Sequence, residues 1–373
     1  MLKLTWRGRN PQIVLSRAFN LPESNPMTNL FPLAYMPEHR WHDPQMQVSF
    51  GQCERNPEQP YRAAATLAAI QALPHIRPIA HTRQATDAEL LTVHSAELIH
   101  FLAEAYGQWE KDYPGQELLP EAFTPVAATT RLPRWLPVHA GHYCLDTATP
   151  IGPHTNRIAR QAAALALDMA ETFLTGENER AYALCRPPGH HAMRGRYGGY
   201  CYFNNAALAG KKLSQRGRVA ILDVDYHHGN GTQEIFYHSD EVLFLSIHAD
   251  PDEEYPYFSG YAEETGAAAG LGFNRNYPLP LHTTDWSVYR PSLQEALDQV
   301  VKQDCWCIVV SFGLDAAATD ALGKFQLTPD NFQQMGQLIA GVGLPVLAIQ
   351  EGGYSEGKAL GEVAAAFVTG LRS

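Results

Sequence analysis

RVAILDVDYHHGNG, residues 218–231, is the stretch that decides the fold of this chain. It begins with apolar residues over the length of one strand and then changes abruptly to Asp, His, Gly and Asn. A buried strand that ends in a polar, glycine-containing loop is typical of a parallel sheet, in which ligands bind beyond the carboxyl ends of the strands. The stretch therefore predicts both a fold class and the place of a site.

The same pattern recurs along the chain. Short apolar runs that end in polar turns lie at residues 181–185, 241–248, 305–313 and 344–353. Apolar residues at helical spacing precede or separate these runs, at residues 62–73, 87–109, 157–174, 206–215, 288–303 and 329–343. Strands that alternate with helices predict an α/β fold with a parallel sheet covered on both faces. We expect a single domain over residues 1–373, because large α/β enzymes often pack this length into one.

Two segments lack this alternation. Residues 1–60 are rich in proline, asparagine and aromatic residues, which argues against long helices and predicts an irregular arm. Residues 107–155 are also predicted to be loop-like. Both segments are long enough to carry functional or interfacial loops.

Composition excludes several classes of protein. The formal net charge of −11 provides no basic surface for nucleic acid, whereas it is compatible with cationic ligands. No run of about 18 apolar residues predicts a membrane span, and the N-terminus lacks the apolar core of a signal peptide. The six cysteines are scattered without a C-x-x-C pair, so we expect a reducing, cytoplasmic location.

The residues after the strands predict a metal centre. Asp223, Asp225 and His227 alternate, so their side chains start on one face of an extended segment. Asp315, which follows another strand, would add a third ligand beside Asp225 and His227 and leave a position open, as catalytic zinc requires. This donor set suits Zn²⁺, and Fe²⁺ would also fit. The alternative is that the aspartates cap turns, with Asp315 as a helix N-cap.

Two further groups predict the chemistry. His190 and His191 lie in a Pro-Gly turn and suit general acid–base catalysis, with Asp223 and Asn230 as available partners. Tyr354 follows a Gly-Gly turn, and its hydroxyl could stabilise an oxyanion opposite the metal. Taken singly, these residues could also be a surface histidine loop and an ordinary turn tyrosine. Together with the metal motif they predict metal-assisted hydrolysis of an amide.

Four blocks in order resemble the histone deacetylase superfamily: RPPGHH, GGYCYFNNAA, DVDYHHGNGTQ and EGGY. The resemblance covers roughly residues 60–370. It implies a single arginase-like α/β domain around a parallel sheet of about eight strands, and zinc bound by Asp225, His227 and Asp315. It also implies that His191 is the general base and acid and that Tyr354 is the catalytic tyrosine.

The resemblance assigns further positions. Asp223 would orient His190, and Asn230 stands beside His191 where many members have aspartate. Gly199 and Tyr200 match the wall of the substrate channel. The family also binds structural potassium, and the matching residues form two sets: Asp223, Asp225, His227, Ser246 and Ile247 in the first, and Phe236, Ser239, Val242 and Phe273 in the second.

Within the superfamily, residues 246–270 are similar to the acetylpolyamine amidohydrolases. This similarity implies a small cationic acetylated substrate and an acidic residue at the channel mouth, for which Glu117 is the match. It also implies a homodimer, with the arm before Tyr61 as a possible dimer contact. Leu322 stands where a polyamine-selective relative has glutamate, which leaves deacetylation of acetyl-lysine as an alternative.

Two other functions are weighed against these. Ureohydrolases share the fold but need two manganese ions and extra carboxylates, which the blocks DVDYHHGNG and SFGLDAAATD do not provide. A non-catalytic acyl-binding module would be favoured if Tyr354 or a metal ligand were missing, and each of them is present.

Overall fold

The computed structural model of the chain describes residues 30–124 and 131–373. Within it, Phe31–Ser373 forms one compact unit. Residues 1–29 of the predicted arm lie outside the described part, so the prediction for them stays a prediction.

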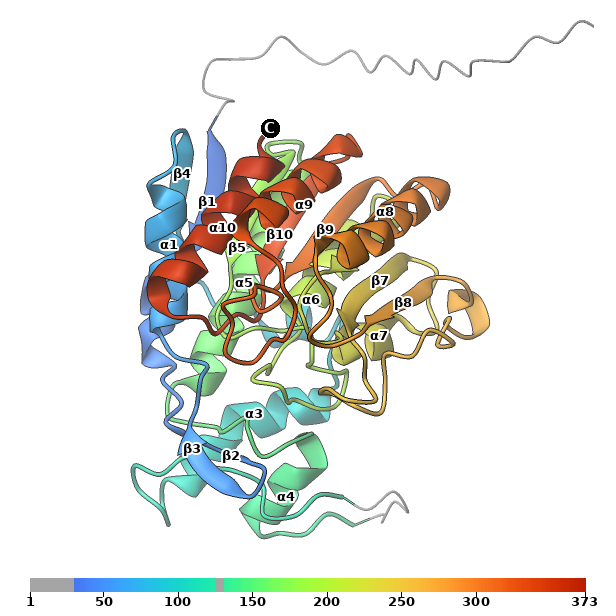
Figure 1. Cartoon of the computed structure of the whole chain (residues 1–373). Helices are drawn as coiled ribbons and strands as arrows, with labels where there is room; N and C mark the ends of the chain where they lie inside the picture. Colours follow the sequence, from blue (N-terminus) through green and yellow to red (C-terminus); the bar gives the residue numbers. More distant parts are fainter. Residues whose placement is uncertain (1–29, 125–130) are drawn as a thin grey trace, which may run out of the picture. The chain divides into compact units, whose positions relative to one another are not determined.

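A parallel sheet of eight strands forms the centre of this unit (Figure 1). From one edge to the other the order is β4 (Ile76–Ala80), β1 (Phe31–Tyr35), β5 (Arg180–Leu184), β10 (Val346–Gln350), β9 (Cys307–Phe312), β6 (Val219–Asp223), β7 (Val242–Ala249) and β8 (Asn274–Leu279). The predicted fold class is therefore confirmed. The five strands predicted from the sequence are β5, β6, β7, β9 and β10.

The prediction of an irregular arm is wrong for residues 31–60. Phe31–Tyr35 is a buried strand that pairs with β4 and β5 inside the sheet. A 3₁₀ helix, η2 (Pro37–Trp41), and a hairpin of β2 (Met46–Ser49) and β3 (Gln52–Arg55) follow it. A five-residue strand among prolines has too little pattern to be seen in the sequence, because pairing with neighbours decides it.

Helices cover both faces of the sheet (Figure 1). One hydrophobic layer joins the sheet to α1 (Tyr61–Gln71), α8 (Trp286–Lys302), α9 (Pro329–Gly341) and α10 (Gly357–Leu371). The other layer joins it to α3 (Ala96–Trp109), α5 (Thr155–Leu174) and α6 (Asn205–Leu213). No helix in the described ranges is long and apolar enough to cross a bilayer.

The helices differ from the prediction in three respects. The single helix expected over residues 87–109 is broken into α2 (Asp87–Leu90) and α3, because the Ser95 hydroxyl accepts a hydrogen bond from the Leu98 amide and starts a new helix. The segment expected to be loop-like contains α4 (Leu136–Tyr143). The helices α7 (Asn230–Phe236) and α10 were not predicted.

Candidate active site

The carboxyl ends of the four central strands deliver the predicted chemistry. β5, β10, β9 and β6 are consecutive neighbours in the sheet. The loops that follow them carry, in the same order, the His190–His191 pair, Tyr354, Asp315, and the Asp225–His227 pair. Residues far apart in the sequence are therefore brought to one edge, as parallel sheets do at their ligand sites.

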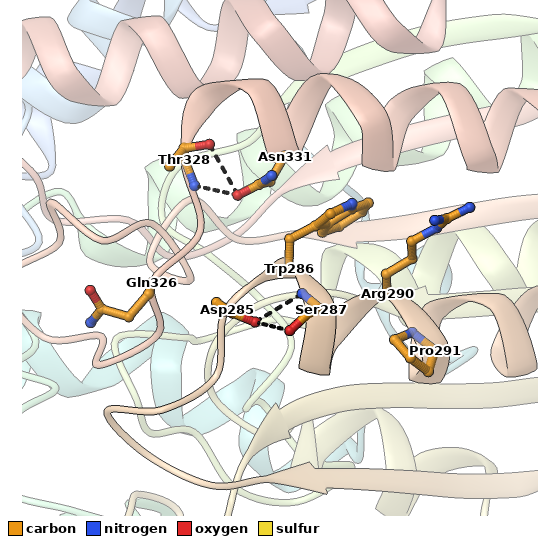
Figure 2. A pocket seen from close by; sticks show the side chains of 8 residues that line it. All are labelled: Asp285, Trp286, Ser287, Arg290, Pro291, Gln326, Thr328 and Asn331. Atoms are coloured by element: carbon orange, nitrogen blue, oxygen red, sulfur yellow. Dashed lines mark hydrogen bonds between the residues drawn. The ribbon is translucent and has the colours of Figure 1, made fainter.

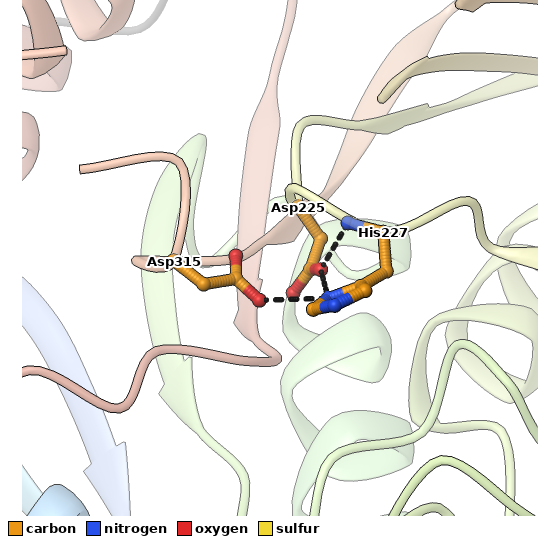
Figure 3. A group of neighbouring side chains, drawn as sticks. All are labelled: Asp225, His227 and Asp315. Atoms are coloured by element: carbon orange, nitrogen blue, oxygen red, sulfur yellow. Dashed lines mark hydrogen bonds and ion pairs between the residues drawn. The ribbon is translucent and has the colours of Figure 1, made fainter. Parts of the chain in front are cut away.

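Asp225, His227 and Asp315 form a compact cluster (Figure 3). One possible ligand atom of each residue lies within 4.8 Å of the others. His227 Nδ1 is 3.1 Å from Asp315 Oδ2 and 3.4 Å from Asp225 Oδ1. Both aspartates are fully buried. The three predicted ligands therefore face a common point, with two carboxylates and one imidazole as donors.

Backbone amides fix the two carboxylates. Asp225 Oδ2 accepts a hydrogen bond from the Gly352 amide at 2.8 Å, and Asp315 Oδ1 accepts one from the Tyr226 amide at 3.0 Å. A Cβ atom at residue 352 would lie 2.4 Å from Asp315 Oδ2 and 2.7 Å from Asp225 Oδ2. Only glycine fits there, so the EGGY loop touches the cluster directly.

The charges of the cluster fit a bound cation. Burial, together with the negative charge of Asp225, raises the pKa of Asp315 to about 7. Two buried carboxylates at this separation repel each other unless a positive charge lies between them. Two oxygen ligands, one nitrogen ligand and no thiolate match the preferences of Zn²⁺ or Fe²⁺. The residues present therefore suit a divalent metal ion.

The two histidines are held by different partners. His190 Nδ1 lies 3.0 Å from Asp223 Oδ2, and His191 Nδ1 lies 2.7 Å from Asn230 Oδ1. Burial opposes the charging of His190, but Asp225 and Asp223 outweigh it and raise its pKa to about 10. Burial lowers the pKa of His191 well below its usual range, and the positive charge of His190 adds to this effect. The surroundings thus favour the charged form of His190 and the neutral form of His191.

Tyr354 is placed by both its backbone and its ring. Its amide donates to Asp320 Oδ2 at 2.6 Å. The Arg62 guanidinium lies over its ring at 4.5 Å, and the Tyr200 ring meets it edge-on at 5.6 Å. The predicted catalytic tyrosine and the predicted channel residue are therefore in contact.

Gly199 and Tyr200 have the backbone that a close approach requires. Both lie in the left-handed region, with φ of +54° and +65°. A Cβ atom at residue 199 would lie 2.2 Å from His191 Cδ2, so the chain passes directly over the imidazole. The Tyr200 hydroxyl donates to Gln47 Oε1 at 2.9 Å.

The sequence reasoning missed Tyr255, which also lies beside the predicted catalytic residues. Its ring centroid is 4.9 Å from that of His191, at 87°, and 6.3 Å from that of His227. Its hydroxyl donates to Asp146 Oδ2 at 3.0 Å. Residues 246–270 had been singled out for their similarity to relatives, but no signal in that segment marked one tyrosine among several.

A buried ionic cluster behind the site was missed as well. The carboxylate of Glu58 lies 2.5 Å from Arg62 Nη1 and 2.9 Å from Arg186 Nη2, and all three residues are buried. Arg62 also donates to the carbonyls of Glu351 and Gly353, on the loop that carries Tyr354. Glu58 lies within the segment predicted to be irregular, which gave no reason to expect a buried charge there.

The other two predicted substrate-binding residues, Glu117 and Leu322, lie in different loops. The carboxylate oxygens of Glu117 accept hydrogen bonds from the amides of Gln45 and Met46 at 3.0–3.3 Å, at the start of β2. Glu117 thus holds a hairpin in place, and the structure does not support its role as a free acid at the channel mouth. Leu322 lies in the loop after Asp315, where its amide donates to Asp320 Oδ1 at 3.0 Å.

The two predicted potassium sets include different parts of β7. In the first, Asp223 at the carboxyl end of β6 is paired in register with Ser246 within β7, and Asp225 and His227 follow Asp223 in the chain. In the second, Val242 opens β7, and the Phe273 carbonyl accepts a hydrogen bond from Phe244. The remaining members lie next to these residues in the chain: Phe236 and Ser239 around the end of α7, and Ile247 in β7. Potassium itself stays a prediction.

A groove of about 700 Å³ has a different set of lining residues (Figure 2). The first residues of α8 and α9 line it, among them Asp285, Trp286, Arg290 and Thr328. Asp285 and Thr328 are the N-caps of these helices, which accounts for their polar atoms. None of the predicted site residues lines this groove.

Comparison with known proteins agrees with the geometry. The histone deacetylase domain family matches residues 56–371. The chain belongs to the histone deacetylase family. An acetylpolyamine amidohydrolase of Mycoplana ramosa is 38% identical over 319 residues, which cover 85% of this chain and 93% of that protein. Acetylpolyamine amidohydrolase 1 of Pseudomonas aeruginosa is 40% identical over 333 residues, 86% of this chain and 93% of its own length.

A solved structure shows the same fold. The crystal structure of acetylpolyamine aminohydrolase from Burkholderia pseudomallei superimposes with a TM-score of 0.85 and 34% identity, over 91% of this chain and 98% of that one. The protein is a deacetylase, as the sequence predicted. Its family indicates a metal cofactor, for which the Asp225–His227–Asp315 cluster has suitable donors.

Proposed function

We propose that the deacetylase removes acetyl groups from acetylated polyamines of the acetylputrescine and acetylcadaverine type, and that it uses zinc. The observation that carries this proposal is the convergence of three metal-ligand residues, a histidine pair and Tyr354 at one sheet edge. Three relatives that match along 93% of their own length are named acetylpolyamine amidohydrolases, which supports an acetylated polyamine as the substrate. The net charge of −11 favours a cationic substrate.

Asp225, His227 and Asp315 would hold the metal ion in this proposal. A divalent ion bound there would polarise the amide carbonyl and make a water molecule more acidic. The amides of Gly352 and Tyr226 keep two of these side chains in place without supplying charge. With three protein ligands, the ion would have a coordination position left for water and substrate.

His191 is the general base and acid. Because its Nδ1 lies 2.7 Å from the Asn230 carbonyl oxygen, Nδ1 carries the hydrogen and Nε2 has a free lone pair. Burial keeps the imidazole neutral, so Nε2 can take a proton from water and later pass it to the leaving amine. His190, oriented by Asp223, supplies a positive charge beside this step.

Tyr354 would stabilise the oxyanion of the tetrahedral intermediate. Its ring is held by Arg62 and Tyr200, so the hydroxyl is positioned before the substrate arrives. A donor that is already oriented stabilises developing charge without reorganising during the reaction.

Deacetylation of acetyl-lysine peptides is a second candidate, which Leu322 favours. This uncharged residue lies two positions after Asp320, in the loop that follows Asp315, so it does not select for a second amine. A side-by-side assay on acetylputrescine, acetylcadaverine, acetylspermidine and an acetyl-lysine peptide separates the two proposals. We expect the highest kcat/KM for an acetylated diamine. Equal or faster turnover of the peptide would overturn the polyamine assignment.

The homodimer and the cytoplasmic location are also proposals. The hairpin of β2 and β3 supports a contact through the segment before Tyr61, because Phe50 at its tip is 97% exposed. Size-exclusion chromatography with light scattering tests this point, and a monomer would contradict it. The six cysteines are free, as expected in a reducing compartment.

A further inference from the structure

Asp146 lies at a junction of three loops. Its Oδ2 accepts hydrogen bonds from the Gly199 amide at 2.6 Å and from the Tyr255 hydroxyl at 3.0 Å. Its Oδ1 accepts from the Ala148 amide and the Thr149 hydroxyl, both at 2.9 Å. One oxygen therefore fixes the carboxylate to its own loop, while the other joins segments that are distant in sequence.

The first of these segments is the backbone over His191. A Cβ atom at residue 198 would lie 2.9 Å from Asp146 Oδ2, and one at residue 199 would lie 2.2 Å from His191 Cδ2. The Gly198–Gly199 backbone is thus enclosed between the carboxylate and the imidazole. The next amide, that of Tyr200, donates to the Thr149 hydroxyl at 2.9 Å. The placement of Tyr200 consequently depends on the same loop.

The second segment carries Tyr255. Its ring packs edge-on against His191, with centroids 4.9 Å apart. A tyrosine ring swings when the Cα–Cβ bond turns, and a hydrogen bond at the hydroxyl restricts this swing because it fixes the far end of the ring. Asp146 Oδ2 therefore holds two groups that contact His191, the Gly199 backbone and the Tyr255 ring.

We propose that Asp146 is a positioning residue, which fixes the opening to the catalytic centre by tying the Gly199–Tyr200 wall to the Tyr255 ring. Tyr200 lies against Tyr354, and Tyr255 lies against His191. A linear acyl-amine must pass these rings to reach the metal-ligand cluster. The inference rests on the proposed role of this cluster in deacetylation. It makes Asp146 a residue that determines the affinity of the enzyme for the aliphatic part of its substrate.

The decisive variant is Tyr255→Phe, which keeps the ring and removes only its hydroxyl. We expect KM for the best acetylated amine to rise roughly fivefold, which corresponds to about 1 kcal/mol, the net value of one hydrogen bond. kcat should change less than twofold, and the metal content and melting temperature should stay unchanged. A change confined to kcat, or no change in KM, would overturn the proposal.

A double-mutant cycle tests whether the effect passes through Asp146. Because Asp146→Ala removes the acceptor, adding Tyr255→Phe to it should raise KM no further. Asp146→Asn, which keeps one acceptor oxygen, should restore part of the loss. Independent, multiplicative effects of the two changes would contradict the tether. If Asp146→Ala folds poorly, the kinetics of Tyr255→Phe alone still test the proposal.

Tyr261→Phe is the matched control. The Tyr261 hydroxyl also donates to an aspartate, Asp252 Oδ1, at 3.1 Å on the surface of the same segment. Removing this hydroxyl should leave KM and kcat within about 1.5-fold of the wild type, since exposed polar contacts contribute little. An equal effect in Tyr261→Phe would show that loss of any hydroxyl from this segment is enough, and would overturn the role of Asp146.

Binding of hydroxamates separates this inference from the identity of the substrate. Octanohydroxamic acid has a chain that must lie between the rings, whereas acetohydroxamic acid does not. In Tyr255→Phe, the Kd of octanohydroxamic acid should rise roughly fivefold while that of acetohydroxamic acid stays within twofold. This result would support the inference even if acetylpolyamines were not turned over. Equal weakening of both ligands would overturn it.

Discussion

Two buried ionic clusters lie in contact with the EGGY loop, and they are neutralised in opposite ways. Glu58 is fully buried between Arg62 and Arg186, so the protein supplies its own cations. Asp225 and Asp315 are equally buried, and among the described residues they form ion pairs with the histidines His227 and His190 instead of arginines. The first cluster is complete as folded, whereas the second has the charge and the geometry to receive an external cation.

The loop connects the two clusters through its backbone. The Gly352 amide donates to Asp225, while the carbonyls of Glu351 and Gly353 accept hydrogen bonds from Arg62. The difference in charge balance therefore predicts two kinds of sensitivity. The Glu58 cluster should determine stability, and the Asp225 cluster should determine metal binding and activity.

Removal of the metal should have the largest effect. A chelator should abolish turnover completely, because the two carboxylates and His227 provide no substitute for the ion, and added Zn²⁺ should restore it. At about 100 times the Kd, the ion should also add about 2.7 kcal/mol to the free energy of unfolding. Turnover, metal analysis and thermal melting measure these changes. Activity that persists without metal would contradict the proposed site.

Glu58→Gln should cost about 3–5 kcal/mol in the free energy of unfolding, since it leaves two buried arginines without their counter-charge. Denaturant unfolding measures this loss, and added metal should not make the variant equal to the wild type. Glu177→Gln is the control, because it breaks the exposed pair with Arg77 and should change stability by less than about 0.5 kcal/mol. Equal losses in both variants would remove the distinction between the clusters.

The loss of stability in Glu58→Gln should depend on pH. Burial raises the pKa of Glu58, but the charges of Arg186 and Arg62 outweigh it, so that the net pKa lies below its usual range. A lowered pKa in the folded state adds stability above the unfolded pKa of about 4.3, and this stability is lost as the pH falls through the folded pKa. The difference between wild type and Glu58→Gln should be constant from pH 5 to 7 and shrink in acid. A constant difference down to pH 2 would argue against the ion pairs.

Tyr354→Phe should reduce kcat roughly 10²–10³-fold, the usual effect of losing one oxyanion donor. The ring stays stacked on Arg62, so stability and metal content should not change. Steady-state kinetics with metal analysis provides the measurement. Full activity would exclude the oxyanion role, and loss of metal would mean that the change disturbs the Asp225 cluster through the loop.

Asp315→Asn should have the smallest effect on the metal-free protein. It removes a carboxylate that is buried beside Asp225 and keeps an oxygen to accept the Tyr226 amide, so the free energy of unfolding should change by less than about 1 kcal/mol. In the presence of metal, by contrast, the variant should bind the ion poorly and have no activity. Unfolding of both forms in denaturant tests this contrast, and a large loss in the metal-free form would contradict it.

The sequence predicted five buried strands of the sheet, and it missed the two edge strands for a physical reason. Residues 242–249 are buried along their whole length, so their composition alone identifies a strand. By contrast, β4 and β8 lie at the edges of the sheet, are partly exposed and contain Pro78 and Pro278. Proline and polar residues are tolerated at edges, which removes the pattern that identifies a strand.

In the site, too, the sequence predicted residues that are close together in the chain and missed contacts between distant ones. Asp225 and His227 were predicted from their spacing, because two residues in an extended segment lie close together in any fold that keeps it extended. Glu117 was assigned from the resemblance alone, in a segment predicted to be loop-like, and its carboxylate accepts hydrogen bonds from the amides of Gln45 and Met46 at the start of β2. Tyr255 and Asp146 were missed, since nothing local connects residues 109 positions apart.

The sequence by itself determined the fold class, the metal-ligand residue types and the family, because these depend on local patterns and on blocks of adjacent residues. Only the tertiary structure decided which carboxylates are neutralised from within. Glu58, Asp146 and Asp315 are all acidic residues in loops, yet one binds two arginines, one ties two loops together and one faces a metal site. The chemistry of a buried charge depends on its neighbours in space, and folding brings these from distant parts of the chain.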